Sequence, residues 1–149
     1  MRVAEFLAEQ QVPFETLLHA PAFTAQNRAK YLHVPGRQVA KSVLLHGPDG
    51  HFLAVLPATH HIDTERLAEA RGGPVRLASD AEIAEVFQDC EWGVVPPFGK
   101  IYGLPVVLDE SLQSEAWIVF EGNSHVEALR LYCRDFEYLE KPRRLRFAF

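Results

Sequence analysis

Cysteine is scarce in this sequence, and the spacings that hold metal ions are missing. Cys90 and Cys133 are the two cysteines among 149 residues, and neither belongs to a CxxC pattern or a Cys/His cluster. The seven histidines include no HExxH spacing. We therefore expect no structural zinc, no catalytic metal, no cofactor and no disulfide framework. A reducing cytoplasm is the expected location.

Long apolar runs and an excess of cations are also missing. No stretch approaches 18 apolar residues, so the sequence predicts neither a signal peptide nor a membrane span. The chain has 15 basic and 20 acidic residues, a net charge of −5. This balance excludes general coating of nucleic acid, and no DNA partner is expected, although a local basic patch can still meet a phosphate.

The remaining composition is that of a globular protein with one core. Hydrophobic residues make up 48% of the chain and charged residues 23%, and no repeat or linker divides the sequence. We expect one domain over residues 1–149.

Asp63 and Ser79 are predicted helix caps, and the latter opens a capping box with Glu82. Expected helices span 3–11, 25–30, 64–70 and 80–87; expected strands span 14–18, 39–45, 52–56, 105–108 and 117–120, the second and third forming a hairpin. The class is mixed α/β or α+β.

Lys41 stands out because strand alternation places it on one face with three aliphatic side chains, Val39, Val43 and Leu45. An ammonium group in that position needs a partner, a route to water or a task. Its stem could pack while its head reaches solvent. Alternatively, it is a cation in a cleft, directed at a phosphate, a hydroxyl or a developing oxyanion.

The segment from Gly93 to Gly99 reads Gly-Val-Val-Pro-Pro-Phe-Gly. Gly93 allows backbone torsions that other residues avoid, and two consecutive prolines provide no N–H groups for a neighbouring strand. The pattern predicts a rigid loop that is not part of a sheet. Such a loop is either a plain structural turn or a place where the amides of Val94 and Val95 point at a ligand carbonyl.

Taken together, these motifs resemble the YbaK/ProX/EbsC family, the free-standing relatives of the editing domain of bacterial prolyl-tRNA synthetases. The matching segments, in chain order, are His19–Thr24, Val39–Leu45, Ala54–Ala58, Gly93–Gly99 and Gly122–His125. The resemblance implies a compact domain with a mixed, barrel-like sheet surrounded by helices, with a further strand at 126–131 and a helix at 135–139. It also implies hydrolysis of the ester that joins a wrong amino acid to tRNA.

The resemblance assigns roles to the two unusual features. The amides of Val94 and Val95, framed by Gly93 and Pro96, would hold the ester carbonyl. Lys41 would bind a phosphate or hydroxyl of the terminal adenosine, or it would orient water with a lowered pKa. An aminoacyl ester is already activated, so a positioned water and oxyanion stabilisation suffice and no covalent nucleophile is needed.

Further residues are candidates for substrate binding by the same resemblance. His125, with Ser124 before it, would line the amino-acid pocket, or His125 would be a surface histidine. His19 and Thr24 would lie near the pocket mouth, although Thr24 is also a predicted helix cap. Phe98 would stack the terminal adenine or pack in the core.

The carboxyl-terminal residues bring four cations together at 141–146. Such a cluster is typical of a solvated tail, and Arg143 and Arg144 are also candidates for phosphate contacts with the tRNA acceptor stem.

The function predicted from these residues is trans-editing deacylation of a tRNA mischarged with a small amino acid such as Ala, Ser or Thr. The expected partners are the acceptor end of aminoacyl-tRNA and a synthetase, and the protein is expected to be a monomer. A non-catalytic module that binds the aminoacyl or nucleotide end is the alternative, and a hydrolase of an unrelated small ester is a third hypothesis.

Overall fold

The computed structural model of the protein describes residues 2–20, 27, 34–114 and 116–149. The helical elements, in chain order, are α1 (Val3–Glu9), η1 (Gly36–Gln38), α3 (Thr64–Arg71), α4 (Asp80–Val86), α5 (Gly99–Tyr102) and α6 (Cys133–Glu140). The strands are β1 (Glu15–Leu18), β2 (Ala40–Gly47), β3 (Gly50–Pro57), β4 (Arg76–Leu77), β5 (Val106–Asp109), β6 (Trp117–Glu121), β7 (Glu127–Tyr132) and β8 (Arg143–Leu145).

Local signals in the sequence place several helix ends correctly. The Asp63 side chain accepts hydrogen bonds from the N–H groups of Glu65 and Arg66 and so caps α3, which ends at Gly72 with φ of 82°. Ser79 and Glu82 form the predicted capping box of α4. These interactions occupy amides that have no partner within the helix, and Gly72 adopts the left-handed torsion without steric cost. The expected helix at 25–30, with Thr24 as its cap, falls outside the described residues.

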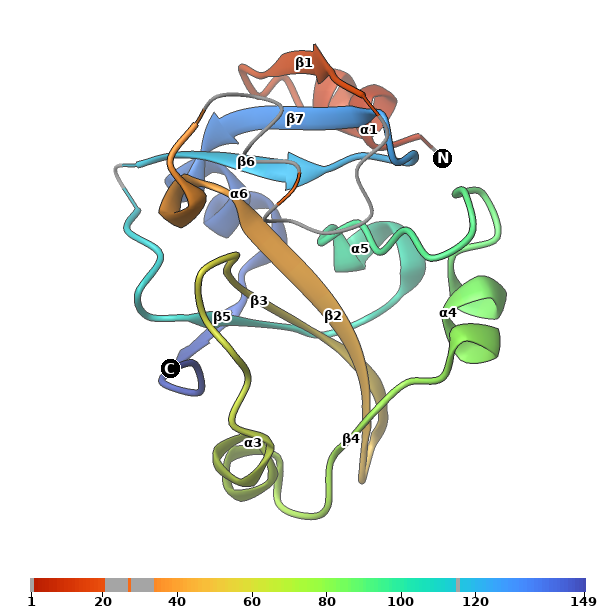
Figure 1. Cartoon of the computed structure of the whole chain (residues 1–149), viewed down its shortest axis with the longest axis vertical. Helices are drawn as coiled ribbons and strands as arrows, with labels where there is room; N and C mark the ends of the chain where they lie inside the picture. Colours follow the sequence, from red (N-terminus) through yellow and green to blue (C-terminus); the bar gives the residue numbers. More distant parts are fainter. Residues whose placement is uncertain (1, 21–26, 28–33, 115) are drawn as a thin grey trace.

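The strands of the described residues form two sheets (Figure 1). A three-stranded antiparallel sheet has the order β1-β7-β6, and a five-stranded mixed sheet has the order β4-β2-β3-β5-β8. The hairpin of β2 and β3 is confirmed, and β5 and β8 run parallel to β3. One bridge, between Val39 and Val119, joins the sheets. The mixed α/β class is confirmed. Among the described residues the sheets do not close into the expected barrel, because a single bridge does not extend the strand pairing of one sheet into the other.

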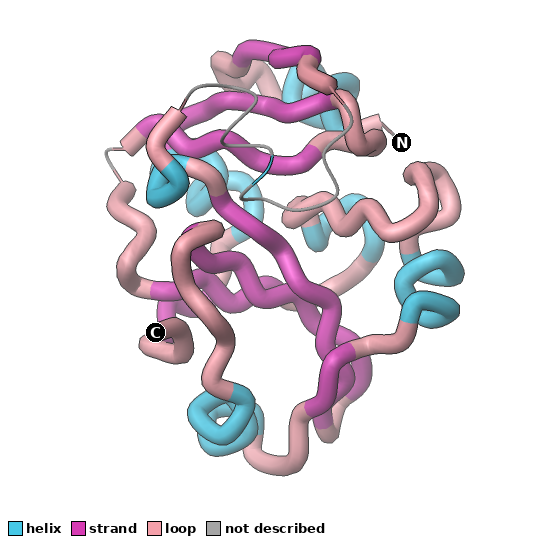
Figure 2. The backbone as a smooth tube through the Cα atoms, viewed as in Figure 1, coloured by secondary structure: helices cyan, strands magenta, loops and turns pink. Residues whose placement is uncertain are grey.

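The core lies on both faces of the five-stranded sheet. Leu53 and Val55 of β3 face one hydrophobic cluster, and Phe52, Ala54 and Leu56 face a second cluster. Strands buried on both faces read as continuous apolar runs rather than as alternating patterns. Figure 2 shows α3 and α4 at the periphery of the molecule, beside the five-stranded sheet, whose strand β3 is largely buried. Among the described residues, none of the helices has the length and apolar character that crossing a bilayer requires.

Candidate functional site

The segment from Glu91 to Phe98 is an irregular loop that begins at the surface and continues through the interior to α5. Trp92 and Gly93 form a turn in which Gly93 has φ of 84°, and both residues are exposed. From Val94 to Gly99 the chain is buried and forms no strand. The loop outside the sheets that the glycine and the two prolines predict is therefore present, and its exposed residues are 91–93.

Two amides of this loop already donate to protein acceptors. The N–H of Val94 donates to the Glu91 carbonyl at 3.1 Å, and the N–H of Val95 donates to Oε2 of buried Glu121 at 3.0 Å. No described residue accepts from the N–H of Gly93. The two amides expected to meet a ligand carbonyl thus donate to protein acceptors, and Gly93 presents an N–H group that no described residue occupies.

His125 lies directly against this turn. Its Nε2 is 2.7 Å from the carbonyl oxygen of Trp92, and because a carbonyl can only accept, Nε2 carries the proton. A Cβ atom added to Gly93 would lie 3.9 Å from the imidazole ring. His125 is buried. The structure therefore brings Gly93 and His125 together, although 32 residues separate them in the chain.

The residues beside His125 shape the connection between β6 and β7. The Ser124 Oγ accepts from the N–H of Val126 at 3.3 Å, so this side chain supports the turn that carries His125. The N–H of His19 donates to the Val126 carbonyl at 3.0 Å, which places His19 at the end of β1 beside the same turn. Nε2 of His19 is buried without a hydrogen-bond partner among the described residues. Thr24, the other residue expected near the pocket mouth, is not among the described residues.

Adjacent residues of β2 point to opposite faces of the sheet, and only one of them contacts the loop. The Ser42 hydroxyl donates to the Val95 carbonyl. Lys41 instead lines a cavity of about 340 Å³ with Val43, His61, Ile62, Thr64 and Leu77. Burial lowers the pKa of the Lys41 ammonium below its usual value. Ser42 is not identified from the sequence as a residue that contacts the loop. Strand alternation could have indicated it, because adjacent residues of a strand face opposite sides of the sheet.

Phe98 belongs to the hydrophobic core. It is fully buried, with ring centroids 5.5 Å from Phe136, 6.0 Å from Phe120 and 6.3 Å from Phe6. Such edge-to-face contacts stabilise an aromatic cluster. The ring is not accessible to an adenine, so the stacking prediction for Phe98 is wrong and core packing is the role that the structure supports.

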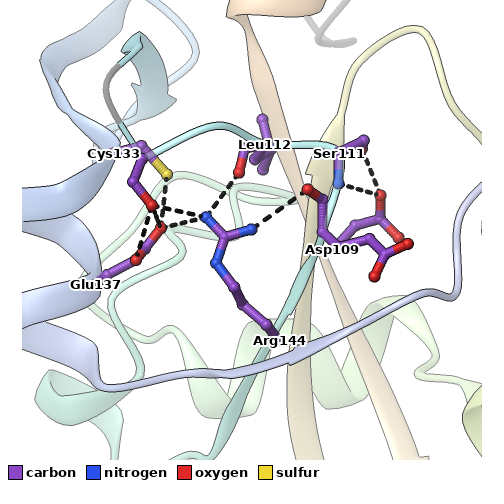
Figure 3. A network of polar contacts seen from close by, with 8 residues as sticks. Asp109, Ser111, Leu112, Cys133, Glu137 and Arg144 are labelled. Carbon is purple, nitrogen blue, oxygen red and sulfur yellow. Dashed lines mark hydrogen bonds and ion pairs between the residues drawn. The ribbon is translucent and has the colours of Figure 1, made fainter.

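The carboxyl-terminal cations do not lie on a solvated tail. Residues 143–145 form β8 beside β5, and Phe147 is buried. The Arg144 guanidinium donates to the carbonyl of Leu112 at 2.7 Å and forms an ion pair with Glu137, as Figure 3 shows. Arg143 donates to the Ala70 carbonyl at 3.2 Å and remains exposed. Strand pairing across the chain, which local charge does not reveal, accounts for the difference.

Metal-ligating side chains do not gather in the part of the chain that the structure describes. No group of three or more His, Cys, Asp or Glu residues is arranged to hold an ion there. The two cysteines are free thiols, and burial raises the pKa of Cys90 to about 11. A thiol with such a pKa is a poor nucleophile at neutral pH.

Comparisons with known proteins agree with this architecture. The fold is similar to that of the hypothetical protein APE2540, with a TM-score of 0.89 and 21% identity over 99% of both chains. It is also similar to a candidate trans-editing enzyme for prolyl-tRNA synthetase, with a TM-score of 0.83 and 23% identity over 97% of this chain and 91% of that chain. These identities show the fold alone. No protein of curated function matches the chain.

The sequence profile of one family matches most of the chain. It is that of the aminoacyl-tRNA editing domain, and it covers residues 19–139. The matched range includes Lys41, the turn at Gly93 and His125, the features described above. The chain therefore belongs to the aminoacyl-tRNA editing domain family.

Proposed function

We propose that this protein is a trans-editing deacylase that hydrolyses the ester between a tRNA and a mischarged small amino acid of the Ala, Ser or Thr class. Family membership supports the reaction class. The observation that carries the assignment to this site is the contact of His125 with the turn at Gly93, because it fixes an open backbone N–H beside a buried imidazole.

The chemistry that this arrangement supports is hydrolysis without a covalent intermediate. An aminoacyl ester needs an attacking water and a donor for the oxygen that becomes negative in the tetrahedral intermediate. The Gly93 N–H is the donor that we assign to this oxygen. The amides of Val94 and Val95, which bond to Glu91 and Glu121, keep the turn rigid so that little reorganisation accompanies the reaction.

Lys41 lines a separate cavity on the other face of β2, and no described contact joins it to Gly93 or His125. We retain it as a candidate for contact with a part of the substrate that reaches that cavity. The lowered pKa of Lys41 leaves two roles, contact with a phosphate or hydroxyl of the terminal adenosine and orientation of the attacking water. The first role needs the charged ammonium, and the second is favoured by the neutral amine. A rate that falls as pH drops through the Lys41 pKa supports the second role.

A deacylation screen with tRNAs charged with Ala, Ser, Thr, Cys and Pro tests the proposal. We expect turnover of one or more of the Ala, Ser and Thr esters. Lys41→Ala should lower the rate at least about tenfold, which is a loss of ~1.4 kcal/mol of barrier stabilisation. Lys100→Ala is the control, since its side chain is exposed and lies outside the cavity that Lys41 lines. Absence of turnover with all five substrates would contradict the proposal.

The alternative is a binding module that holds an aminoacyl-tRNA end without hydrolysing it. One observation favours it: the loop amides of Val94 and Val95 already donate to protein acceptors, which leaves the N–H groups of the exposed turn, Trp92 and Gly93, for a ligand. The same screen separates the two functions. Binding of charged tRNA that protects the ester from spontaneous hydrolysis would support the module, whereas accelerated release of the amino acid would support the enzyme.

A further inference from the structure

Trp92 is a large aromatic side chain held at the surface by a fixed backbone. It is 67% exposed, its carbonyl accepts from His125 Nε2 at 2.7 Å, and the turn continues through Gly93 with φ of 84°. Most large apolar side chains of this protein are buried, so an exposed indole on an anchored turn is unusual. The backbone constraint reduces the entropy that a ligand must remove when it contacts the ring.

The other tryptophan shows what a paired indole looks like in this molecule. The Trp117 ring is 3.7 Å from the Tyr132 ring between centroids, and the Arg130 guanidinium lies 5.2 Å from its centroid. Within the described part of the chain, no aromatic ring or cation lies over the Trp92 indole in this way. With 67% of its surface exposed, the Trp92 side chain is accessible to a flat ligand.

A cleft of about 190 Å³ lies beside Trp92, between the turn and α4. Ile83, Phe87 and Val94 contribute apolar walls to this cleft, and Gln88 contributes an amide that can both donate and accept. An open indole, apolar walls and one amide are suited to a nucleobase, which offers a π-face for stacking and a polar edge for hydrogen bonds.

The negative charge around this cleft favours the base of a nucleotide over its phosphate as the group that binds there. Glu91 lines the cleft, and Asp89 and Glu85 lie exposed on the same stretch of chain. Carboxylates disfavour a phosphate at this position. The cleft therefore differs in kind from a backbone-binding groove, which would be lined with lysine and arginine.

We propose that Trp92 and the adjoining cleft form a nucleobase-binding site that stacks an unpaired base of the tRNA 3′ end. The inference rests on the proposed function, because the turn that holds Trp92 also holds Gly93. It replaces the stacking role that the sequence suggested for Phe98, which is buried. Trp92 is a positioning residue in this scheme: it fixes the nucleotide next to the ester, and it takes no part in the bond changes.

Fluorescence titration with an uncharged RNA tetranucleotide, ACCA, tests this site without any hydrolysis. In a Trp117→Phe background, the signal comes from Trp92 alone, and we expect it to be quenched on binding. Trp92→Ala, followed by calorimetry, should weaken binding about 5- to 150-fold, and Trp92→Phe should retain most of the affinity because it keeps a stacking surface. Tyr138→Ala, which removes a 74% exposed aromatic on α6, is the control and should bind as the wild type does.

Two further measurements decide the interpretation. The ratio of the affinities of wild type and Trp92→Ala should stay constant between about 50 and 200 mM salt, since stacking neutralises no phosphate. A tetranucleotide that lacks its terminal bases should bind wild type and Trp92→Ala equally. Equal affinity of wild type and Trp92→Ala for intact ACCA, or a ratio that collapses with salt, would overturn the proposal.

The outcome is separable from that of the proposed function. Quenching by ACCA without turnover of any charged tRNA would remove the deacylase assignment and keep the base site. Turnover with unchanged binding and unchanged KM in Trp92→Ala would keep the deacylase and remove the base site.

Discussion

The loop at 91–99 and the carboxyl-terminal segment at 143–149 are fastened to the core by the same device, a carboxylate that accepts backbone N–H groups. Glu140 accepts from the N–H of Lys100, just after the loop, at 3.1 and 3.2 Å. Asp109 accepts from the N–H groups of Phe147 and Ala148 at 3.0 and 2.9 Å, and from the N–H and hydroxyl of Ser111. One carboxylate has a single donor residue and the other has three.

Burial and the hydrogen-bond donors together set the direction in which the pKa of each carboxyl group moves. Burial raises the pKa of Glu140 to about 7, because the Lys100 N–H offsets only part of the desolvation. Burial alone would also raise the pKa of Asp109, but the hydrogen bonds from Ser111, Phe147 and Ala148 lower it below its usual value. The carboxyl-terminal segment is thus held by Asp109, which is ionised at neutral pH. The end of the loop is held by Glu140, which titrates near neutral pH.

The two segments also differ in what they leave exposed. The carboxyl-terminal segment buries Phe147 and pairs with β5, so its role is structural. The loop leaves Trp92 and Gly93 at the surface, although both are held by the residues around them. Exposure on a rigid support is the property that distinguishes the candidate site from an ordinary connection.

The largest expected effect is on deacylation, and comparing two glycines of similar φ separates it from a general loss of stability. Gly93→Ala should lower deacylation about 100- to 1,000-fold, because a residue strained at φ of 84° would redirect the N–H assigned to the oxyanion. Gly72→Ala is a close control, with φ of 82° and no atom near the added Cβ, at the end of α3. Both variants should lose similar stability in urea unfolding. A wild-type deacylation rate in folded Gly93→Ala would show that the loop is only structural.

A smaller effect is expected from the anion of the carboxyl-terminal segment. In Asp109→Asn, the new NH₂ group would face the N–H of Ser111, so unfolding free energy at pH 7 should fall by about 1–3 kcal/mol. Because the folded pKa of Asp109 is lowered, its contribution is present above the unfolded pKa near 3.8 and is lost as pH falls through the folded pKa. The difference from wild type in urea unfolding should therefore shrink near pH 3. A constant difference across this range would contradict the account.

The smallest effect has the opposite sign and concerns Glu140. Because its folded pKa of about 7 is above the usual 4.5, the contribution of the protonated carboxyl is fully present below pH about 4.5 and is lost as pH rises through 7. Glu140→Gln should thus be more stable than wild type near pH 8 by about 1–2 kcal/mol, and close to wild type near pH 4. Urea unfolding at both pH values tests this. A variant less stable than wild type at pH 8 would show that the charged carboxylate is the favoured partner of Lys100.

Features set by local interactions were predictable from the sequence. The caps at Asp63 and Ser79 and the hairpin around Gly47 and Gly50 depend on residues within a few positions of one another, and all are present. β8 was not predicted because its pairing partner, β5, lies more than thirty positions earlier in the chain and β8 itself is rich in arginine. Without knowledge of that pairing, the cluster of cations in the sequence indicates a solvated tail.

The candidate site was predictable in its motif but not in its geometry. The glycine and prolines of the loop indicated a rigid turn, and the resemblance indicated His125. The sequence did not determine which aromatic side chain would be exposed, because Trp92 precedes the motif, Phe98 lies within it, and only tertiary packing buries Phe98 among other rings. Likewise, the acceptor of the Val95 N–H is Glu121, which lies on β6 and is distant in the sequence.

The three-stranded sheet has a consequence for how the chain folds. Its strand β1 pairs with β7, and α1 beside it is tied to the same region by hydrogen bonds between Val3 and Asn123, and Arg2 and Glu127, with sequence separations of 120 and 125 residues. To form contacts between residues this distant, nearly the whole chain must lose the entropy of loop closure before the contacts stabilise it. Such contacts therefore slow folding. The hairpin of β2 and β3 depends on local contacts, whereas the turn that carries His125 depends on β1, so we expect the hairpin to form first. A nascent chain would therefore hold a formed sheet for some time before it holds a competent site.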